Sequence, residues 1–348
     1  MLQGKTYDEL IPYLDKREQR CADYIVNSEI ISVSTKQQSL SMTFQGIIAL
    51  TPSETAHSQI ASKLGIPKVY YDRMRRYAPQ LLVDNIHCWF SLEPKDWMLR
   101  TLDGSVLRAF LSNRYRRIND SIVVKMVIDA CFDRRDQPYP LHMDVTDNFV
   151  HITMLYPTEY EIEYNRTVKV GFTFRNSEVG LGSLILEPFF YRSYCKNGCI
   201  FGKREIEGLR VRHLGPVVAA ENYYKMTDHI NIDGLEGRLK DSISALSNPP
   251  FIGSMINSLR EANQSMQLAK PEETLEFLAK EFGLTEQQKS LALENFLDEG
   301  NYSKWGVCNA FTSLANTAKD ADEQLRLMQV GQKVLNIGKR PWERLTQN

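Results

Sequence analysis

The chain has 348 residues, of which 43% are apolar and 24% charged. This is ordinary globular composition, long enough for two domains, and it excludes an extended disordered chain. With 42 Lys and Arg against 43 Asp and Glu, the net charge of −1 does not by itself indicate a partner.

The first predicted elements in chain order are two helices. Pro52, Ser53 and Glu54 are typical of a helix start, and Gly65 ends that helix. Pro67 begins the second helix. Two helices joined by a short turn are compatible with a DNA-binding helix-turn-helix, although helical hairpins without this function are common.

Strands dominate the next part of the chain. WMLRTL and VLRAFL form a predicted hairpin around Asp103-Gly104, followed by a helix over DSIVVKMVIDACF. Residues 141–218 alternate between apolar and polar and are predicted to be mostly strands. The sequence therefore predicts an α+β fold, with a mainly antiparallel β core and packed helices in residues 1–222. An α-helical C-terminal region is predicted over residues 223–348.

The N-terminus has no apolar core of signal-peptide length, and no later run approaches the roughly 18 apolar residues that cross a membrane. We therefore expect a cytoplasmic protein without a membrane partner. The six cysteines are scattered except for Cys195 and Cys199, as expected for small buried apolar residues in a reducing compartment.

Metal and cofactor sites are not expected. Cys195 and Cys199 lie four apart and are followed by His213, whereas a zinc site usually has two close pairs of ligands. A hairpin turn carrying two thiols is the favoured interpretation. Phosphate-loop, nucleophile-elbow, zinc-protease and dinucleotide-binding motifs are absent from the sequence.

A metal-dependent nuclease is the alternative enzyme. Asp144 and Asp147 stand at predicted strand ends, and His142 or His151 would assist them. Acids beside a hairpin turn are, however, more often turn formers.

Basic and aromatic residues point to an anionic polymer. Between Ala61 and Lys125 there are twelve Lys and Arg against six Asp and Glu. Arginine binds phosphate oxygens in a bidentate manner, and arginine and tyrosine both stack on bases. The predicted phosphate contacts are Arg73, Arg76, Arg100, Arg108, Arg114, Arg116 and Arg117, and the predicted stacking residues are Tyr71, Tyr77 and Tyr115. The competing interpretation makes these arginines internal partners of Asp72, Asp96, Asp103 or Asp120.

Three segments resemble a phage- and plasmid-borne family of uncharacterised proteins: RTLDGSVLRAFLSNRYRRIND, NSEVGLGSLILEPFFYRSYCKNGCI and WGVCNAFTSLAN. The matching residues are Ser112, Arg114, Tyr115, Asn176, Ser177, Gly180, Arg192, Cys195, Asn197 and Gly198. The Asn and Gly residues are typical turn formers, but turn geometry does not call for Arg114 or Arg192. Arg192 therefore joins the predicted contacts. The resemblance implies a mobile element as the source and no established activity.

We expect a non-catalytic, single-stranded DNA-binding protein of a phage or plasmid, acting in strand annealing or recombination in the bacterial cytoplasm. It would need no cofactor and would form a homo-oligomer. Apart from the nuclease, one alternative is a module that inhibits host defence. In that case, the C-terminal helices would dock a host or phage protein.

Overall fold

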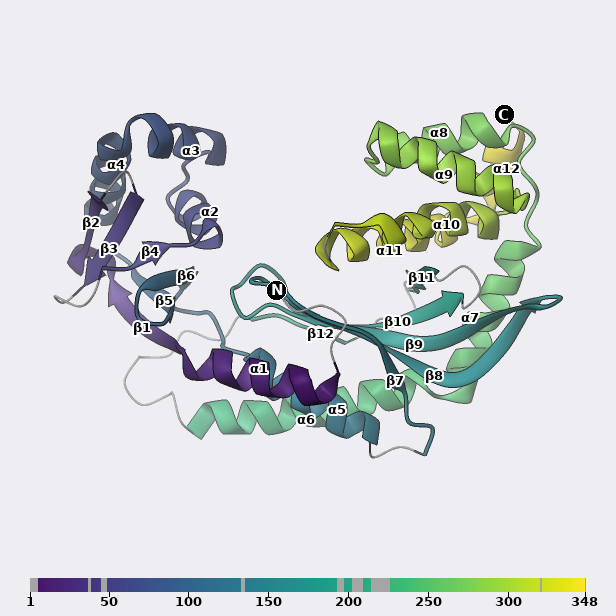
Figure 1. Cartoon of the computed structure of the whole chain (residues 1–348), viewed down its shortest axis with the longest axis horizontal. Helices are drawn as coiled ribbons and strands as arrows, with labels where there is room; N and C mark the ends of the chain where they lie inside the picture. Colours follow the sequence, from purple (N-terminus) through teal and green to yellow (C-terminus); the bar gives the residue numbers. More distant parts are fainter. Residues whose placement is uncertain are drawn as a thin grey trace.

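The computed structural model describes residues 6–36, 39–44, 49–132, 135–192, 197–201, 209–213, 226–319 and 321–347. Its elements form three parts arranged as a U (Figure 1). An N-terminal lobe and a group of C-terminal helices are the two arms, and a curved antiparallel sheet with helices beneath it joins them. The predicted α+β fold is confirmed.

The N-terminal lobe combines strands with three helices. Its four-stranded sheet has the order β1-β5-β6-β4, and β2 and β3 form a separate hairpin. The bounds are β1 Cys21–Asn27, β2 Ile31–Lys36, β3 Ser39–Phe44, β4 Thr51–Pro52, β5 Asp96–Leu102 and β6 Val106–Ser112; the helices are α2 Glu54–Lys63, α3 Lys68–Tyr77 and α4 Pro79–Leu92. Apolar side chains from both kinds of element form a core of this lobe's own.

The central sheet has the order β11-β10-β9-β8-β7, with β12 beside β10. Its bounds are β7 Tyr139–Val145, β8 Val150–Glu163, β9 Arg166–Asn176, β10 Leu184–Arg192, β11 Asn197–Ile200 and β12 Leu209–Val211. Helices α1 (Tyr7–Gln19), α5 (Asp120–Phe132) and α6 (Met226–Leu246) cover its lower face and share a core with it (Figure 1).

The remaining helices form the C-terminal arm, above the other face of the sheet at its far end (Figure 1). They are α7 Pro249–Asn263, α8 Pro271–Glu281, α9 Glu286–Glu299, α10 Lys304–Ser313, α11 Ala321–Leu335 and α12 Lys339–Gln347. Phe189 and Phe190 of β10 pack into their core beside Trp305 and Phe311. Because α6 packs on the sheet with α5, the helical part of the chain begins inside the central body. Among the described residues, no helix is both long and apolar enough to cross a membrane.

Helix caps and turn residues in the sequence explain several of these helix and strand boundaries. The Ser53 side chain accepts a hydrogen bond from the Ala56 amide and caps α2, as its sequence indicates. Asp103 and Gly104, which have φ values of 54° and 62°, turn β5 into β6. Both residues of such a tight turn need a left-handed backbone, which explains the Asp-Gly pair.

Candidate nucleic-acid interface

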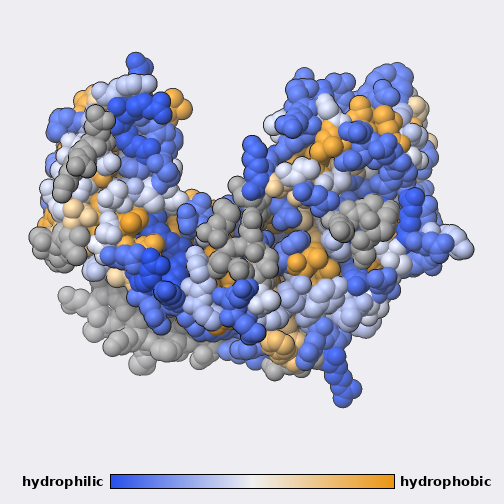
Figure 2. Space-filling model, viewed as in Figure 1, coloured by the Kyte–Doolittle hydropathy of each residue, from blue (hydrophilic) through white to orange (hydrophobic). Residues whose placement is uncertain are grey.

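A deep opening separates the N-terminal lobe from the C-terminal helices (Figure 2). The central sheet lies below it, and α2 and α3 lie on the side of the N-terminal lobe nearer to it (Figure 1). The Thr55 hydroxyl of α2 donates to Asn148 Oδ1 at 2.7 Å, so α2 rests on the turn between β7 and β8. The N-terminal lobe therefore contacts the central sheet at this turn.

Helix α3 presents arginine and tyrosine side chains on one face. Val69, Tyr70 and Tyr77 are 84%, 48% and 74% exposed, and Arg73 and Arg76 are also exposed. At about 100° per residue these five positions span about 120° of the helix, and we call them the outer face of α3. Neither arginine has an ion-pair partner among the described residues, and no acid lies on this face.

The sequence of α3 explains why these side chains point outward. Tyr71 and Met74, on the opposite side, are buried against the lobe. Asp72 is occupied by Lys68 one turn away, at 2.5 Å, and Arg75 pairs with Glu54 of α2 at 2.9 Å. The acids near α3 are thus used locally, which leaves Arg73 and Arg76 without counter-charges.

The loop that follows β6 adds further exposed arginine. Arg114 is exposed and Arg116 is half-buried, and neither side chain has a partner among the described residues. Arg117 is half-buried and pairs with Asp23 at 3.3 Å. Arg114 and Arg116 therefore remain candidate contacts, whereas Arg117 already has an internal partner.

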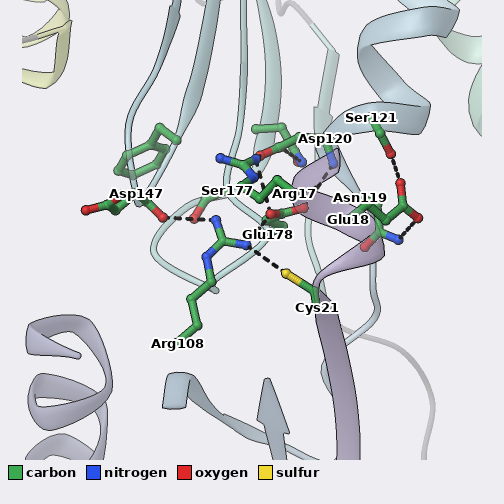
Figure 3. A network of polar contacts seen from close by, with 12 residues as sticks. Arg17, Glu18, Cys21, Arg108, Asn119, Asp120, Ser121, Asp147, Ser177 and Glu178 are labelled. Atoms are coloured by element: carbon green, nitrogen blue, oxygen red, sulfur yellow. Dashed lines mark hydrogen bonds and ion pairs between the residues drawn. The ribbon is translucent and has the colours of Figure 1, made fainter. Parts of the chain in front are cut away.

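Other arginines of the predicted set lie in a buried charge cluster between the N-terminal lobe and the central sheet (Figure 3). The charge cluster consists of Arg17, Asp23, Arg100, Arg108, Asp120 and Glu178. Glu178 stands at its centre, in the turn after β9. Its carboxylate accepts a hydrogen bond from Arg108 and lies 3.1 Å from Arg17 and 3.7 Å from Arg100. Arg17, Arg100 and Arg108 thus face the carboxyl groups of Asp23, Asp120 and Glu178, and Asp23 also pairs with Arg117.

The cluster shifts the pKa values of its two fully enclosed acids in opposite directions. Burial would raise the pKa of Glu178, but Arg100, Arg108 and Arg17 lower it to about 2. Burial and the neighbouring Glu178 raise the pKa of Asp120 to about 7, even though Arg17 donates to it at 2.5 Å. Glu178 is therefore the anion that holds the arginines together.

Four of the predicted contact residues are buried and have partners inside the protein, which corrects their predicted exposure. Arg100 and Arg108 are 2% and 7% exposed and neutralise Glu178. Tyr115 is buried, donates to the Ser177 carbonyl at 2.9 Å and stacks on His213. Arg192 is 2% exposed and pairs with Glu299 at 2.6 Å. Arginine spacing along the sequence does not show that an acid 70 to 107 residues away will face each of these three arginines.

Tyr71 is also corrected, because it is buried and its hydroxyl lies 2.9 Å from His57 Nδ1. Tyr70, which the sequence prediction omitted, is the exposed neighbour. Helical periodicity was the available signal: Tyr70 shares a face with Arg73 and Tyr77, whereas Tyr71 shares one with Met74.

The predicted nuclease residues are not assembled into a metal site. His142, Asp144 and His151 lie at one small pocket on the upper face of the sheet, but Asp147 is in the exposed turn, where its carbonyl accepts from Arg108. His151 Nε2 lies 2.8 Å from Asp322 Oδ1 of α11. Within the described part of the chain, no group of three or more His, Cys, Asp or Glu has metal-binding geometry.

The two cysteines considered as zinc ligands, Cys195 and Cys199, are likewise not seen to form a metal site within the described residues. Cys195 lies outside the described residues. Cys199 is fully buried, with its sulfur 3.9 Å from that of Cys308, while His213 stacks on Tyr115 near the charge cluster. Burial raises the pKa of Cys199, which keeps it a thiol.

Comparisons with family models, curated proteins and solved structures find no match to this chain. Its membership of the mobile-element family therefore stays a prediction.

Proposed function

We propose that this protein binds nucleic acid through the outer face of α3, with single-stranded DNA as the preferred form. The observation that carries the proposal is the unpaired arginine and exposed tyrosine on that face of a helix that lies on the side of the lobe nearer to the opening (Figure 1). Arginine neutralises phosphates while tyrosine stacks on unpaired bases, and neither contact depends on base sequence.

Duplex DNA is the second candidate. Helices α2 and α3 are joined by the four residues Leu64 to Pro67, a connection similar to that of a helix-turn-helix. Single-stranded DNA is preferred because tyrosine stacking requires bases that are not already stacked within a duplex.

The first test is a titration of the full chain against a labelled strand of about 40 nucleotides and the matching duplex, at several salt concentrations. We expect tighter binding to the single strand and a linear decrease of log K with log salt concentration. Absence of binding at about 50 mM salt would contradict the proposal.

The Arg73→Gln/Arg76→Gln double variant tests the location. Loss of two phosphate contacts should reduce the salt slope by about 1.4 for a single strand. Arg238→Gln/Arg340→Gln is the matched control, because it removes the same charge from exposed positions on α6 and α12. The location on α3 is wrong if both double variants behave alike.

A role in strand annealing or recombination stays part of the proposal. It requires that bound bases remain available for pairing, and it is tested by the annealing rate of two complementary strands with and without protein. An unchanged or slower rate would leave binding and protection as the function.

A further inference from the structure

The upper face of the central sheet carries two arginines, Arg175 and Arg210, that form no ion pair within the described residues, although the charge of Glu187 acts on both. Arg175 of β9 is paired in register with Ile185 of β10, which is paired in turn with Arg210 of β12. Side chains at paired positions point to the same face of a sheet. Two strand spacings separate the arginine backbones, about 10 Å, so both guanidinium groups can approach one group placed between them.

The neighbours of Arg175 and Arg210 in the strands show that both side chains point to the upper side of the sheet. Leu184, Leu209 and Val211 belong to the core shared with the lower helices, so the alternating positions Ile185 and Arg210 point to the opposite side. Arg175 helps to line the small pocket beneath α11, on that same upper side. This side of β9, β10 and β12 faces the opening (Figure 1).

In the part of the chain that the structure describes, Arg175 lacks the ion pair that each of the buried arginines has. Arg17, Arg100, Arg108 and Arg192 each lie within 4 Å of a carboxylate. Arg175 is mostly buried, its Nε has no hydrogen-bond partner, and the structure gives it no ion pair within the described residues. Its guanidinium lies over the Phe149 ring, 5.3 Å from the centroid.

The surroundings leave this charge only partly compensated. Burial lowers the pKa of Arg175, and the nearby Arg210 acts in the same direction, while Glu187 and Asp322 oppose it from beyond salt-bridge distance. Asp322 is already bonded to His151. Arg210 is exposed and, like Arg175, has no ion pair within the described part of the chain.

We propose that Arg175 and Arg210 form a phosphate-binding site on the upper face of the central sheet, and that the site holds a phosphate of the strand bound by α3. That the phosphate belongs to the bound strand rests on the proposed function. Arginine pairs suit phosphate because each guanidinium donates two parallel hydrogen bonds to its oxygens. Phe149 fixes the orientation of Arg175, and the Thr55–Asn148 contact joins its turn to α2, against which α3 packs.

Titration of the full-length Arg175→Gln/Arg210→Gln variant with the same strand tests the site. We expect a salt slope lower by about 1.4 and an affinity lower by about tenfold at moderate salt. Combination with Arg73→Gln/Arg76→Gln should lower the slope further. If the strand binds and the Arg175→Gln/Arg210→Gln variant keeps the original slope, the site is refuted while the function proposed for α3 stands.

A second measurement separates failure of the site from failure of the function. Inorganic phosphate should raise the melting temperature of the native chain above its value in chloride of equal ionic strength, and the double variant should lose this increase. A chain that binds no DNA but shows this Arg175-dependent increase has a phosphate site for a small molecule, and the function proposed for α3 fails. Absence of both effects overturns the site as well.

Arg210→Gln alone keeps the test valid if the double variant does not fold. Arg210 is exposed and has no ion pair within the described residues, so this change should leave the fold intact. We expect it to lower the salt slope by about 0.7. A slope equal to that of the native chain would refute the contribution of Arg210.

Discussion

The buried carboxylate of Glu178 shows how this chain pairs its buried charges with one another. Glu178 contacts three arginines from different elements: Arg17 of α1, Arg100 of β5 and Arg108 of β6. Such a buried carboxylate is costly to desolvate, and it is stable only because cations surround it. Arg100 and Arg108, which were predicted to contact DNA, are buried here and their charges are paired with Glu178.

His57 has a clear pH signature. Burial lowers its pKa from the ordinary 6.5 to about 4. The unfolded chain therefore takes up a proton here below about pH 6.5, whereas the folded chain does so only near pH 4. Between these values we expect the free energy of unfolding to decrease as pH falls, by up to about 1.4 kcal/mol per pH unit from this histidine.

Urea unfolding at pH 7, 6, 5 and 4 measures this effect, with His57→Gln as the comparison. The difference between the two proteins is the quantity of interest, because Asp120, with its pKa of about 7, becomes protonated and stabilises the fold over the same range. A His57→Gln protein with the same pH dependence as the native chain would contradict the assignment.

At the scale of elements, strands β8 and β9 approach unusually closely at Gly171. A Cβ at this position would lie 1.8 Å from the Met154 carbonyl oxygen. The pairing of β8 with β9 is irregular immediately beyond Leu155, which is the residue opposite Gly171. The close approach and the irregularity bend the sheet that lies below the opening.

Gly171→Ala should therefore destabilise the protein by about 1–3 kcal/mol, because the backbone of β8 must move. Chemical denaturation measures the change. Gly253→Ala in α7 is the control, since nothing lies within 4 Å of an added Cβ there. The control should be neutral or stabilising by up to about 1 kcal/mol. Equal effects of the two changes would show that the close approach is unimportant.

At the scale of the whole molecule, the N-terminal lobe has a core separate from the two cores around the central sheet. The turn after β9 is one of its main attachments to the sheet. Besides Glu178, the Val179 carbonyl accepts from Gln59 of α2 at 2.6 Å. The charge cluster and this hydrogen bond therefore attach the N-terminal lobe to the central sheet.

Glu178→Gln should weaken this attachment. The three arginines would lose their central anion, which costs about 3–5 kcal/mol in comparable buried pairs. We expect differential scanning calorimetry to show an early transition of the N-terminal lobe, separated from that of the rest. Glu159→Gln, which changes an exposed partner of Lys169, is the control. A melting profile like that of the native chain would show that the cluster does not couple the parts.

The sequence by itself predicted the α+β class, the α2–α3 hairpin, the Asp103-Gly104 turn and the switch to helices in the C-terminal part. These features depend on caps, turns and periodicity, which act over a few residues. The strands before Thr51 and helix α1 were not predicted, although α1 supplies Arg17 to the charge cluster.

Only the tertiary structure decided which arginines are available. Arg73 and Arg100 look equivalent in the sequence, but one is exposed on α3 and the other faces Glu178, 78 residues away. Arg175 and Arg210 gave no local signal, because β-sheet pairing joins them through Ile185. A charge is neutralised or left free by neighbours in space, and those neighbours come from strands and turns distant in the chain.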